Sequence, residues 1–394
     1  MRAGAAWLLV FAVSLTQSPR VHAAGATPNA AVAPAKPNAA VDATPSPSPA
    51  RRALGAGAAV VPGALVHGAG HFVIGESDTA VRLLIAEGIG LGMLLGGGSV
   101  LFLTGASRYV VGPAAGIAAL GAGLFGTSLA ADVYGTVSTD GGAADLVPRA
   151  PPKLESELGY RYVSDSLFPY RHFMVERLTL TLGAVRVTPS AWLDPSGKNA
   201  RYRLEGGYRL IGLDPGERRQ HAFDDRLEVE VGLVHHRYPT QGFTRSSAEI
   251  ALASRYDLAH LGPSLRGAFV EFAAGYGRAR IDYDLRGLDV PADTDDVLLA
   301  RFGFGAVFRG NTYPGSQALL YYDHRHDDFA AGLLVTGLGS GVVGHFGTEW
   351  RWFFTPSFGL LAEAELGSAL VTGISVLYRH AEGTRVLRNE ESKP

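Results

Sequence analysis

Cysteine is absent from the 394 residues, and charged residues make up only 18% of them. Without thiols, the chain has no disulfides, no cysteine-zinc sites, no thiol nucleophile and no lipid-anchored cysteine. The charged share is below the roughly one quarter that is usual for soluble domains. The formal net charge of −2 gives no electrostatic reason to expect nucleic acid as a partner. Together with 51 glycines, these shortages suit a membrane-embedded or tightly packed protein.

The first residues have the three parts of an export signal. Arg2 supplies the positive start, residues 5–15 form a short apolar core, and residues 21–23 suit a cleavage site. We predict a signal peptide over residues 1–23 and a chain that is secreted from the cytoplasm. A retained membrane anchor is the alternative, which the short apolar run disfavours.

The next two segments differ sharply in composition. Residues 24–52 are mostly Ala, Pro, Asn and Ser, so they should form a disordered tether. Residues 53–137 are an apolar helical segment with two Gly/Ala-rich stretches, residues 79–105 and 109–135, each long enough to cross a bilayer. We expect these stretches to form a packed helical hairpin, with a shorter apolar helix before it near residues 54–66. A buried hairpin of a soluble domain is the alternative.

Period-two alternation dominates the rest of the chain. Residues 138–153 read as a linker, residues 154–380 as strands and residues 381–394 as a polar tail. In the stretch "ARYRLEGGYRLIG", residues 200–212, Tyr202 and Leu204 share one face, while Arg203 and Glu205 share the other. Similar stretches separated by turn-rich breaks predict about twelve strands, many of about ten residues.

Alternation alone does not say which face meets water. The export signal, the strand lengths and the aromatic residues near strand ends favour a membrane barrel, with the apolar face against lipid. The other face repeatedly carries both Arg and Glu, which fits a lumen filled with paired charges. The charges expected to face the lumen are Arg203, Glu205, Arg209, Glu228, Glu230, Glu249, Arg255, Glu271, Arg301, Glu349, Arg351, Glu363 and Glu365.

The last strand carries a further pattern. In "VTGISVLYRH", Gly373, Val376 and Tyr378 have the spacing of the C-terminal assembly signal of outer-membrane barrels. The chain therefore resembles a Gram-negative outer-membrane β-barrel protein over residues 154–380. The resemblance implies location in the cell outer membrane, contact with membrane lipids and the barrel assembly machinery as a partner. The expected fold class is mainly β: a transmembrane antiparallel barrel of about twelve strands, preceded by a Gly/Ala-rich helical hairpin.

The leading function is a structural or narrow, porin-like pore or transport role. One alternative is a barrel enzyme that modifies lipid or lipopolysaccharide, with His235, His236 or His324 as the base. Another alternative is a soluble periplasmic β-sandwich binding protein.

Catalysis, metals and cofactors find little support in the sequence. No serine lies in a nucleophile motif, so an enzyme is not favoured and no cofactor is expected. No metal is expected either: His67 and His71 are better explained by a helix end, and residues 322–328, "YDHRHDD", by a solvated hairpin turn.

Overall fold

A computed structural model describes most of the chain. The described residues are 47–105, 110–138, 151–165, 171–213, 223–239, 242–283, 291–308, 315–326, 328–330, 332–335 and 339–380. The expected signal peptide over residues 1–23, most of the tether over residues 24–52 and the tail over residues 381–394 lie outside the described residues.

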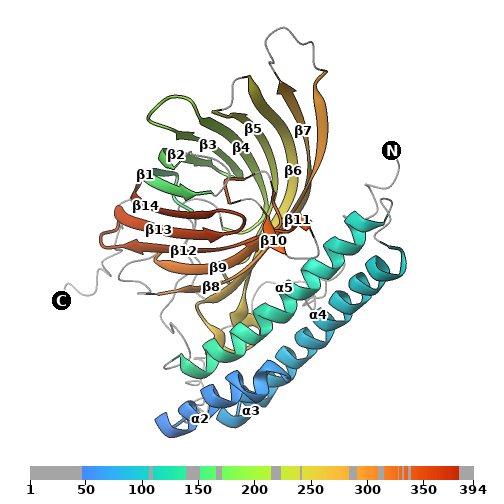
Figure 1. Cartoon of the computed structure of the whole chain (residues 1–394). Helices are drawn as coiled ribbons and strands as arrows, with labels where there is room; N and C mark the ends of the chain where they lie inside the picture. Colours follow the sequence, from blue (N-terminus) through green and yellow to red (C-terminus); the bar gives the residue numbers. More distant parts are fainter. Residues whose placement is uncertain are drawn as a thin grey trace, which may run out of the picture. The chain divides into compact units, whose positions relative to one another are not determined.

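The N-terminal part of the described chain is helical (Figure 1). Its elements are α2 (Pro49–Val60), η1 (Pro62–Ala64), α3 (Ala69–Ile74), α4 (Ser77–Leu103) and α5 (Val111–Val137). Helix α2 begins inside the segment that the sequence analysis assigns to the tether. The Oγ of Ser48 accepts a hydrogen bond from the backbone N–H of Arg51, which caps the helix. Arg51 also donates from Nε to the carbonyl of Val73 at 2.7 Å, so tertiary contacts fix this start.

Helices α4 and α5 touch through their backbones. A Cβ on Gly90 would lie 2.7 Å from the backbone nitrogen of Phe125, and one on Gly121 would lie 2.4 Å from that of Leu94. Larger residues would push the helices apart, so glycine is needed at both positions. Both helices are long and apolar enough to cross a membrane.

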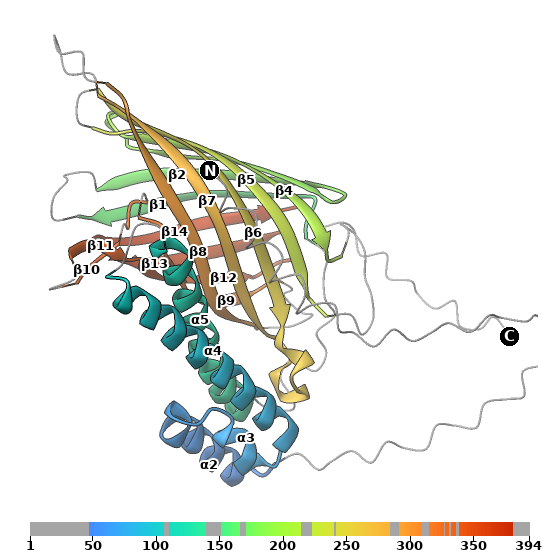
Figure 2. The same ribbon diagram turned by 90° about the vertical axis from the view of Figure 1, so that its right-hand side faces the viewer.

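The rest of the described chain is strand (Figure 1, Figure 2). The strands are β1 (Leu154–Ser164), β2 (His172–Leu182), β3 (Val185–Leu193), β4 (Ala200–Ile211), β5 (Arg226–Arg237), β6 (Phe243–Asp257), β7 (Ala268–Tyr283), β8 (Asp293–Val307), β9 (Gln317–Asp323), β10 (Leu333–Val335), β11 (Gly339–Val343), β12 (His345–Phe353), β13 (Phe358–Leu366) and β14 (Leu370–Arg379). Two short 3-10 turns, η2 (Leu258–His260) and η3 (Pro263–Leu265), join β6 to β7.

Twelve of these strands form one closed antiparallel barrel, and β10 pairs only with β11. Strand β1 closes the barrel on β14, with a register that runs from Glu155 opposite Arg379 to Ser164 opposite Leu370. The chain enters and leaves the barrel at one end, which we call the terminal end; the other is the opposite end. The predicted barrel is thus confirmed. The alternative of a soluble β-sandwich is wrong, because the twelve strands close into one barrel and do not form two packed sheets.

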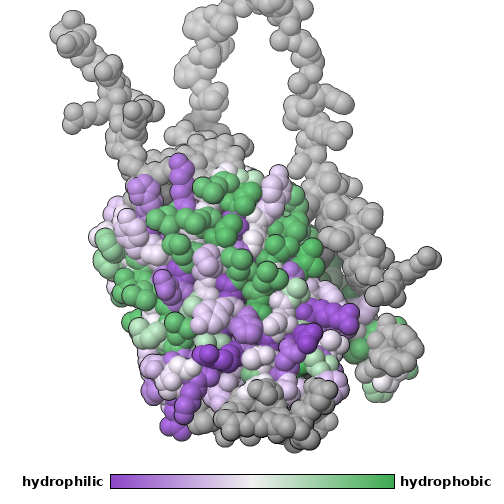
Figure 3. Space-filling model, turned by 90° about the horizontal axis from the view of Figure 1, so that it is seen from above, coloured by the Kyte–Doolittle hydropathy of each residue, from purple (hydrophilic) through white to green (hydrophobic). Residues whose placement is uncertain are grey.

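The apolar face of each strand lies outside. In β4, Leu204 is 48% exposed, whereas Arg201 is 6% exposed and points inward. The exposed face also carries Tyr202, Tyr208 and Leu210, and its neighbours on β5 and β6 continue the pattern. Seen from above, hydrophobic residues gather in broad patches over part of the molecule (Figure 3). A surface of this kind suits lipid, because apolar side chains left in water lose their hydrophobic stabilisation.

A polar junction ties the helices to the barrel at its terminal end. We use this name for Glu76, His71, Asp132 and Ser264. Ser264, in η3, donates from Oγ to Oε2 of Glu76 at 2.5 Å and lies 3.2 Å from Nε2 of His71. Nδ1 of His71 lies 2.6 Å from Oδ1 of Asp132. Ser264 is only 4% exposed and does not line the lumen cavity, so we assign the junction a structural role.

Asp132 is the acceptor on which this junction depends. Its carboxylate also accepts hydrogen bonds from the backbone N–H groups of Gly68, Gly70 and His71, at 2.9 to 3.2 Å. All of these groups are buried, and each donor left unpaired costs about 1–3 kcal/mol.

We therefore predict that Asp132→Ala loosens α3 from α5 while the barrel stays folded. Limited proteolysis should then cut near residues 67–71, and the shift in gel mobility between unheated and heated samples should persist. Asp78→Ala, at an exposed position in the first turn of α4, is the matched control and should resist the protease like the native chain. Equal protease resistance of Asp132→Ala would contradict the assignment.

Candidate functional site: the barrel lumen

The barrel encloses a cavity of about 1430 Å³ that is lined by residues from every strand of the barrel. Of the thirteen charges that the sequence analysis expects in the lumen, the structure places twelve on the cavity wall: Arg203, Glu205, Arg209, Glu228, Glu230, Arg255, Glu271, Arg301, Glu349, Arg351, Glu363 and Glu365. Glu249 is also buried inside the barrel but lies beside the cavity, held by Arg325.

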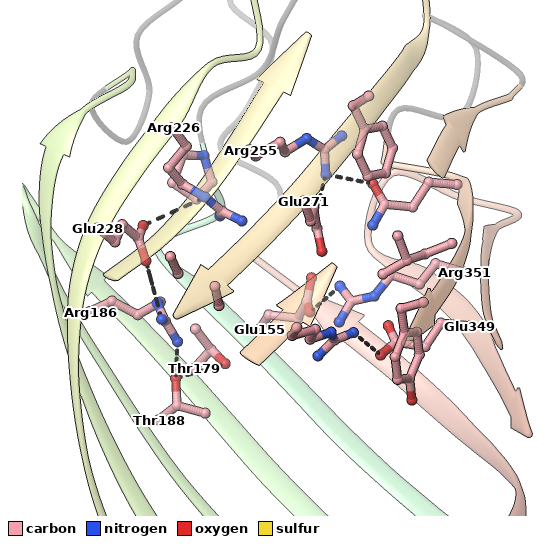
Figure 4. Close-up of a pocket in the computed structure, with 18 of the residues that line it drawn as sticks. Glu155, Thr179, Arg186, Thr188, Arg226, Glu228, Arg255, Glu271, Glu349 and Arg351 are labelled. Carbon is pink, nitrogen blue, oxygen red and sulfur yellow. Dashed lines mark hydrogen bonds and ion pairs between the residues drawn. The ribbon is translucent and has the colours of Figure 1, made fainter. Parts of the chain in front are cut away.

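Arg186, on β3, is the centre of the largest cluster (Figure 4). Its guanidinium lies 3.4 Å from Glu205, 3.1 Å from Glu228 and 2.5 Å from Glu230. Arg203 adds a second cation, with Nε 2.8 Å from Oε2 of Glu205. Charge-assisted contacts of this kind are stronger than neutral hydrogen bonds, so the cluster braces β3, β4 and β5 from inside.

Arg161, on β1, holds a second cluster across the barrel seam. It donates to Glu157 at 2.7 Å and to the hydroxyl of Ser375 at 2.7 Å, and it forms an ion pair with Glu363. A Cβ on Gly373 would lie 2.1 Å from Cδ of Arg161. Glycine at 373 therefore leaves the space in which this arginine lies.

A third group of lumen arginines contacts carboxylates and, at Arg255, an aromatic ring (Figure 4). Arg255 lies 3.5 Å from Glu271 and stands 3.4 Å over the ring of Phe269. Arg351 donates to Glu155 at 2.9 Å. Ring faces attract cations, so Arg255 is held by two kinds of contact.

The cavity wall is nearly balanced in charge. Fourteen Lys or Arg residues and thirteen Asp or Glu residues line it. This balance gives no strong preference for one sign of ion. The sequence analysis missed Glu155, Arg161, Arg177 and Arg186 of β1 to β3. The same alternation runs through these strands and would have found them.

A segment after β9 folds back into the barrel and closes it. This closing segment consists of residues 324–326 and 328–330. Arg325 donates two hydrogen bonds to Glu249 of β6, at 2.9 and 2.7 Å, and Asp328 forms an ion pair with Arg201 of β4. The interpretation of residues 322–328 as a solvated hairpin turn is therefore wrong. Its partners lie on distant strands, which a local pattern does not reveal.

An apolar cap completes the closure near the opposite end of the barrel. Phe329 stacks on Trp192 with ring centroids 4.9 Å apart and contacts Phe173 at 4.6 Å. The apolar cap consists of Val163, Phe173, Trp192, Phe329, Ala330, Ala369 and Val371. The apolar cap therefore packs the closing segment against the inner face of β1, β2, β3 and β14 near that end.

The three histidines named as possible bases lie in different surroundings. His235 is on the outer face, with Nδ1 2.9 Å from the hydroxyl of Ser246. His236 faces inward and lies 2.8 Å from Oδ1 of Asn199. His324 is in the closing segment, where burial and the nearby His326 lower its pKa to about 4. The structure does not bring the three together. The described residues contain no group of three or more acidic or histidine side chains that could hold a metal.

No family model and no curated protein matches the sequence. Among solved structures, the KdgM porin in complex with disordered oligogalacturonate is 6% identical with a TM-score of 0.35, covering 57% of this chain and 99% of that one. The NanC porin is 14% identical with a TM-score of 0.31, covering 57% and 100%. Outer membrane phospholipase A from Escherichia coli is 13% identical with a TM-score of 0.30, covering 59% and 92%.

The barrel's own geometry defines the class. A closed sheet leaves no free backbone edge, its outer face is apolar and its inner face is charged. The chain is therefore a β-barrel protein of the outer-membrane type, and we place it in the outer membrane.

The closing segment should respond to acid through Asp328. Burial alone would raise the pKa of Asp328, but the charges of Arg201, Arg325 and His345 outweigh burial and hold that pKa well below its usual range. A carboxylate with a lowered pKa adds stability that is complete above its unfolded pKa of about 3.9 and is lost as the pH falls below it.

We predict that the fluorescence of Trp192 shifts to the red as the pH falls below about 4. Asp328→Asn should show much of this shift already at pH 7, and Trp192→Phe should remove the pH-dependent signal. An acid response that is identical in the native chain and in Asp328→Asn would contradict the role of this carboxylate.

Proposed function

We propose that the protein is a narrow passage for ions and small hydrophilic solutes, closed in this state by its own closing segment. The strongest support is the bidentate contact of Arg325 with Glu249 inside the lumen. A segment that only needed to cover the barrel could lie outside it. This one carries charges into the lumen and pairs them with the wall.

The contents of the lumen support passage over a purely structural role. The cavity is polar and large enough for many water molecules, at about 1430 Å³. A protein that needed only a rigid barrel could fill this space with apolar side chains, because replacing buried ion pairs with well-packed hydrophobic residues is often neutral or stabilising.

The closure can open without unfolding the barrel. The closing segment connects β9 to β10 and is not a strand of the barrel, so its release leaves the pairing of the twelve barrel strands intact. The segment is held by two ion pairs, by the stacking of Phe329 and by two backbone hydrogen bonds. In these, His324 donates to the carbonyl of Ala300, and Ala369 donates to the carbonyl of Ala330. An opening of this kind resembles the local, low-stability motions by which loops commonly act as gates.

We predict that Arg325→Ala raises the conductance of barrels reconstituted in planar bilayers. Removing one partner of a buried ion pair costs about 3–5 kcal/mol. This corresponds to about a hundredfold or greater rise in the ratio of open to closed barrels. Phe329→Ala should act in the same direction through the apolar cap.

Arg280→Ala is the matched control, because its ion pair with Asp282 lies on an exposed part of the wall. It should leave the conductance unchanged. If Arg325→Ala and Phe329→Ala conduct no better than the native barrel while remaining folded by gel mobility, the closing segment is not a gate and the role is structural.

A second candidate function is a barrel enzyme that cleaves lipid esters, favoured by one contact. Nδ1 of His235 lies 2.9 Å from Oγ of Ser246, and both side chains are exposed on the outer face. A histidine in this position can accept the serine proton as the hydroxyl attacks an acyl carbon. Among the described residues, no carboxylate is found to accept a hydrogen bond from His235, so the pair lacks the third member of a triad.

An assay for fatty-acid release distinguishes the lipid-cleaving enzyme from a passage without catalytic activity. If the pair is catalytic, the native protein releases fatty acid from phospholipid vesicles, and Ser246→Ala lowers that rate by orders of magnitude. Ser254→Ala, on the same strand, is the control. If the native protein releases none, the contact is structural and the passage stands alone.

A further inference from the structure

We propose that α4 and α5 are embedded in the same bilayer as the barrel, with lipid acyl chains covering the outward face of α4. This goes beyond the proposed passage and does not depend on whether the lumen opens. It rests on the barrel lying in a membrane.

The first support is the surface on which α5 lies. Val270 of β7 points outward yet is 6% exposed, whereas Ile250 on the neighbouring strand points outward and is 54% exposed. Val270 is covered because it packs in one cluster with Leu83 of α4 and Ala131 of α5. The helices therefore lie on the wall that faces lipid elsewhere around the barrel.

Close contacts fix α5 to that wall. A Cβ on Gly123 would lie 2.5 Å from the ring of Phe302, so the helix backbone rests directly on this outward side chain. Tyr134 meets Phe304 edge to face, with centroids 6.1 Å apart. Both phenylalanines belong to β8. Helices packed this tightly on a lipid-facing wall have the bilayer as their surroundings.

The second support is the apolar surface that the helices leave uncovered. On α4, Ile89, Leu95 and Phe102 are more than half exposed, and Leu95 is 59% exposed. The outer face of the barrel carries the same kind of surface beside β7, where Ile250 of β6 is 54% exposed. In water it would be unfavourable, since about 25 cal/mol per Å² of apolar surface is gained on burial. Lipid acyl chains can bury this surface without a specific protein partner.

The third support is the distribution of ionisable residues. Residues 88–103 and 111–131 contain none. The charged side chains gather at the other end of the helices, where Arg82 donates to the carbonyls of His260 and Leu261, at 2.9 and 3.1 Å. The polar junction lies at this same end. Each helix has 27 residues and is about 40 Å long, which exceeds the roughly 30 Å hydrocarbon core.

Site-directed spin labelling tests the proposal on the full chain in phospholipid vesicles. The sequence contains no cysteine, so each single-cysteine variant needs no other substitution. Leu95→Cys reports on α4, Ile250→Cys on the barrel wall and Arg280→Cys on an exposed, charged position. The measurement is the collision rate of each label with oxygen, which concentrates in lipid, and with a water-soluble nickel chelate.

We expect the oxygen-to-nickel ratio at Leu95→Cys to match that at Ile250→Cys and to exceed that at Arg280→Cys. A water-like ratio at Leu95→Cys with a lipid-like ratio at Ile250→Cys would overturn the proposal and leave the barrel in place. Exclusion of both reagents, with magnetic broadening between labels, would also overturn it and indicate a second copy of the chain. Water-like ratios at both Leu95→Cys and Ile250→Cys would overturn the proposal and would also show that the barrel wall does not face lipid.

Discussion

The hydrogen bonds between β1 and β14 are the constraint on which the rest of the structure depends. They join the two ends of the sheet, so none of the twelve barrel strands has a free edge. A backbone without free edges can lie in hydrocarbon, because every strand is satisfied by its neighbours. Closure also creates an inside and an outside. Once these exist, the period-two alternation of each strand sends one set of residues to lipid and the other to the lumen.

The lumen then needs a solution for its charges. Charges confined in a narrow interior are unfavourable unless they are paired. Arg161 and Arg186 each contact three side chains that carry oxygen acceptors, so they brace the wall while leaving a polar cavity. The closing segment uses the same chemistry. Its Arg325 and Asp328 are complementary to Glu249 and Arg201, so the wall holds the segment by the kind of contact that holds the wall together.

The sequence predicts those features that depend on local order. The alternation of Tyr202 and Leu204 with Arg203 and Glu205 is enough to predict a strand with two unlike faces, and many such strands predict a barrel. Features that depend on distant partners do not follow from it. The closing segment looks like a polar turn until Glu249, 76 residues away, is placed beside Arg325. The polar junction likewise joins Ser264 to His71 across 193 residues. The start of α2 depends on a contact with Val73 that composition does not show.

The central claim is that the apolar faces lie outside and the charged faces inside. The most direct test places an environment-sensitive fluorophore at consecutive single-cysteine positions along residues 202–210 of β4, in the full protein reconstituted in lipid. The structure predicts emission that alternates at every residue, with the nonpolar signal at Tyr202, Leu204 and Tyr208 and the polar signal at Arg203 and Glu205. The reverse alternation, or none, would contradict the account.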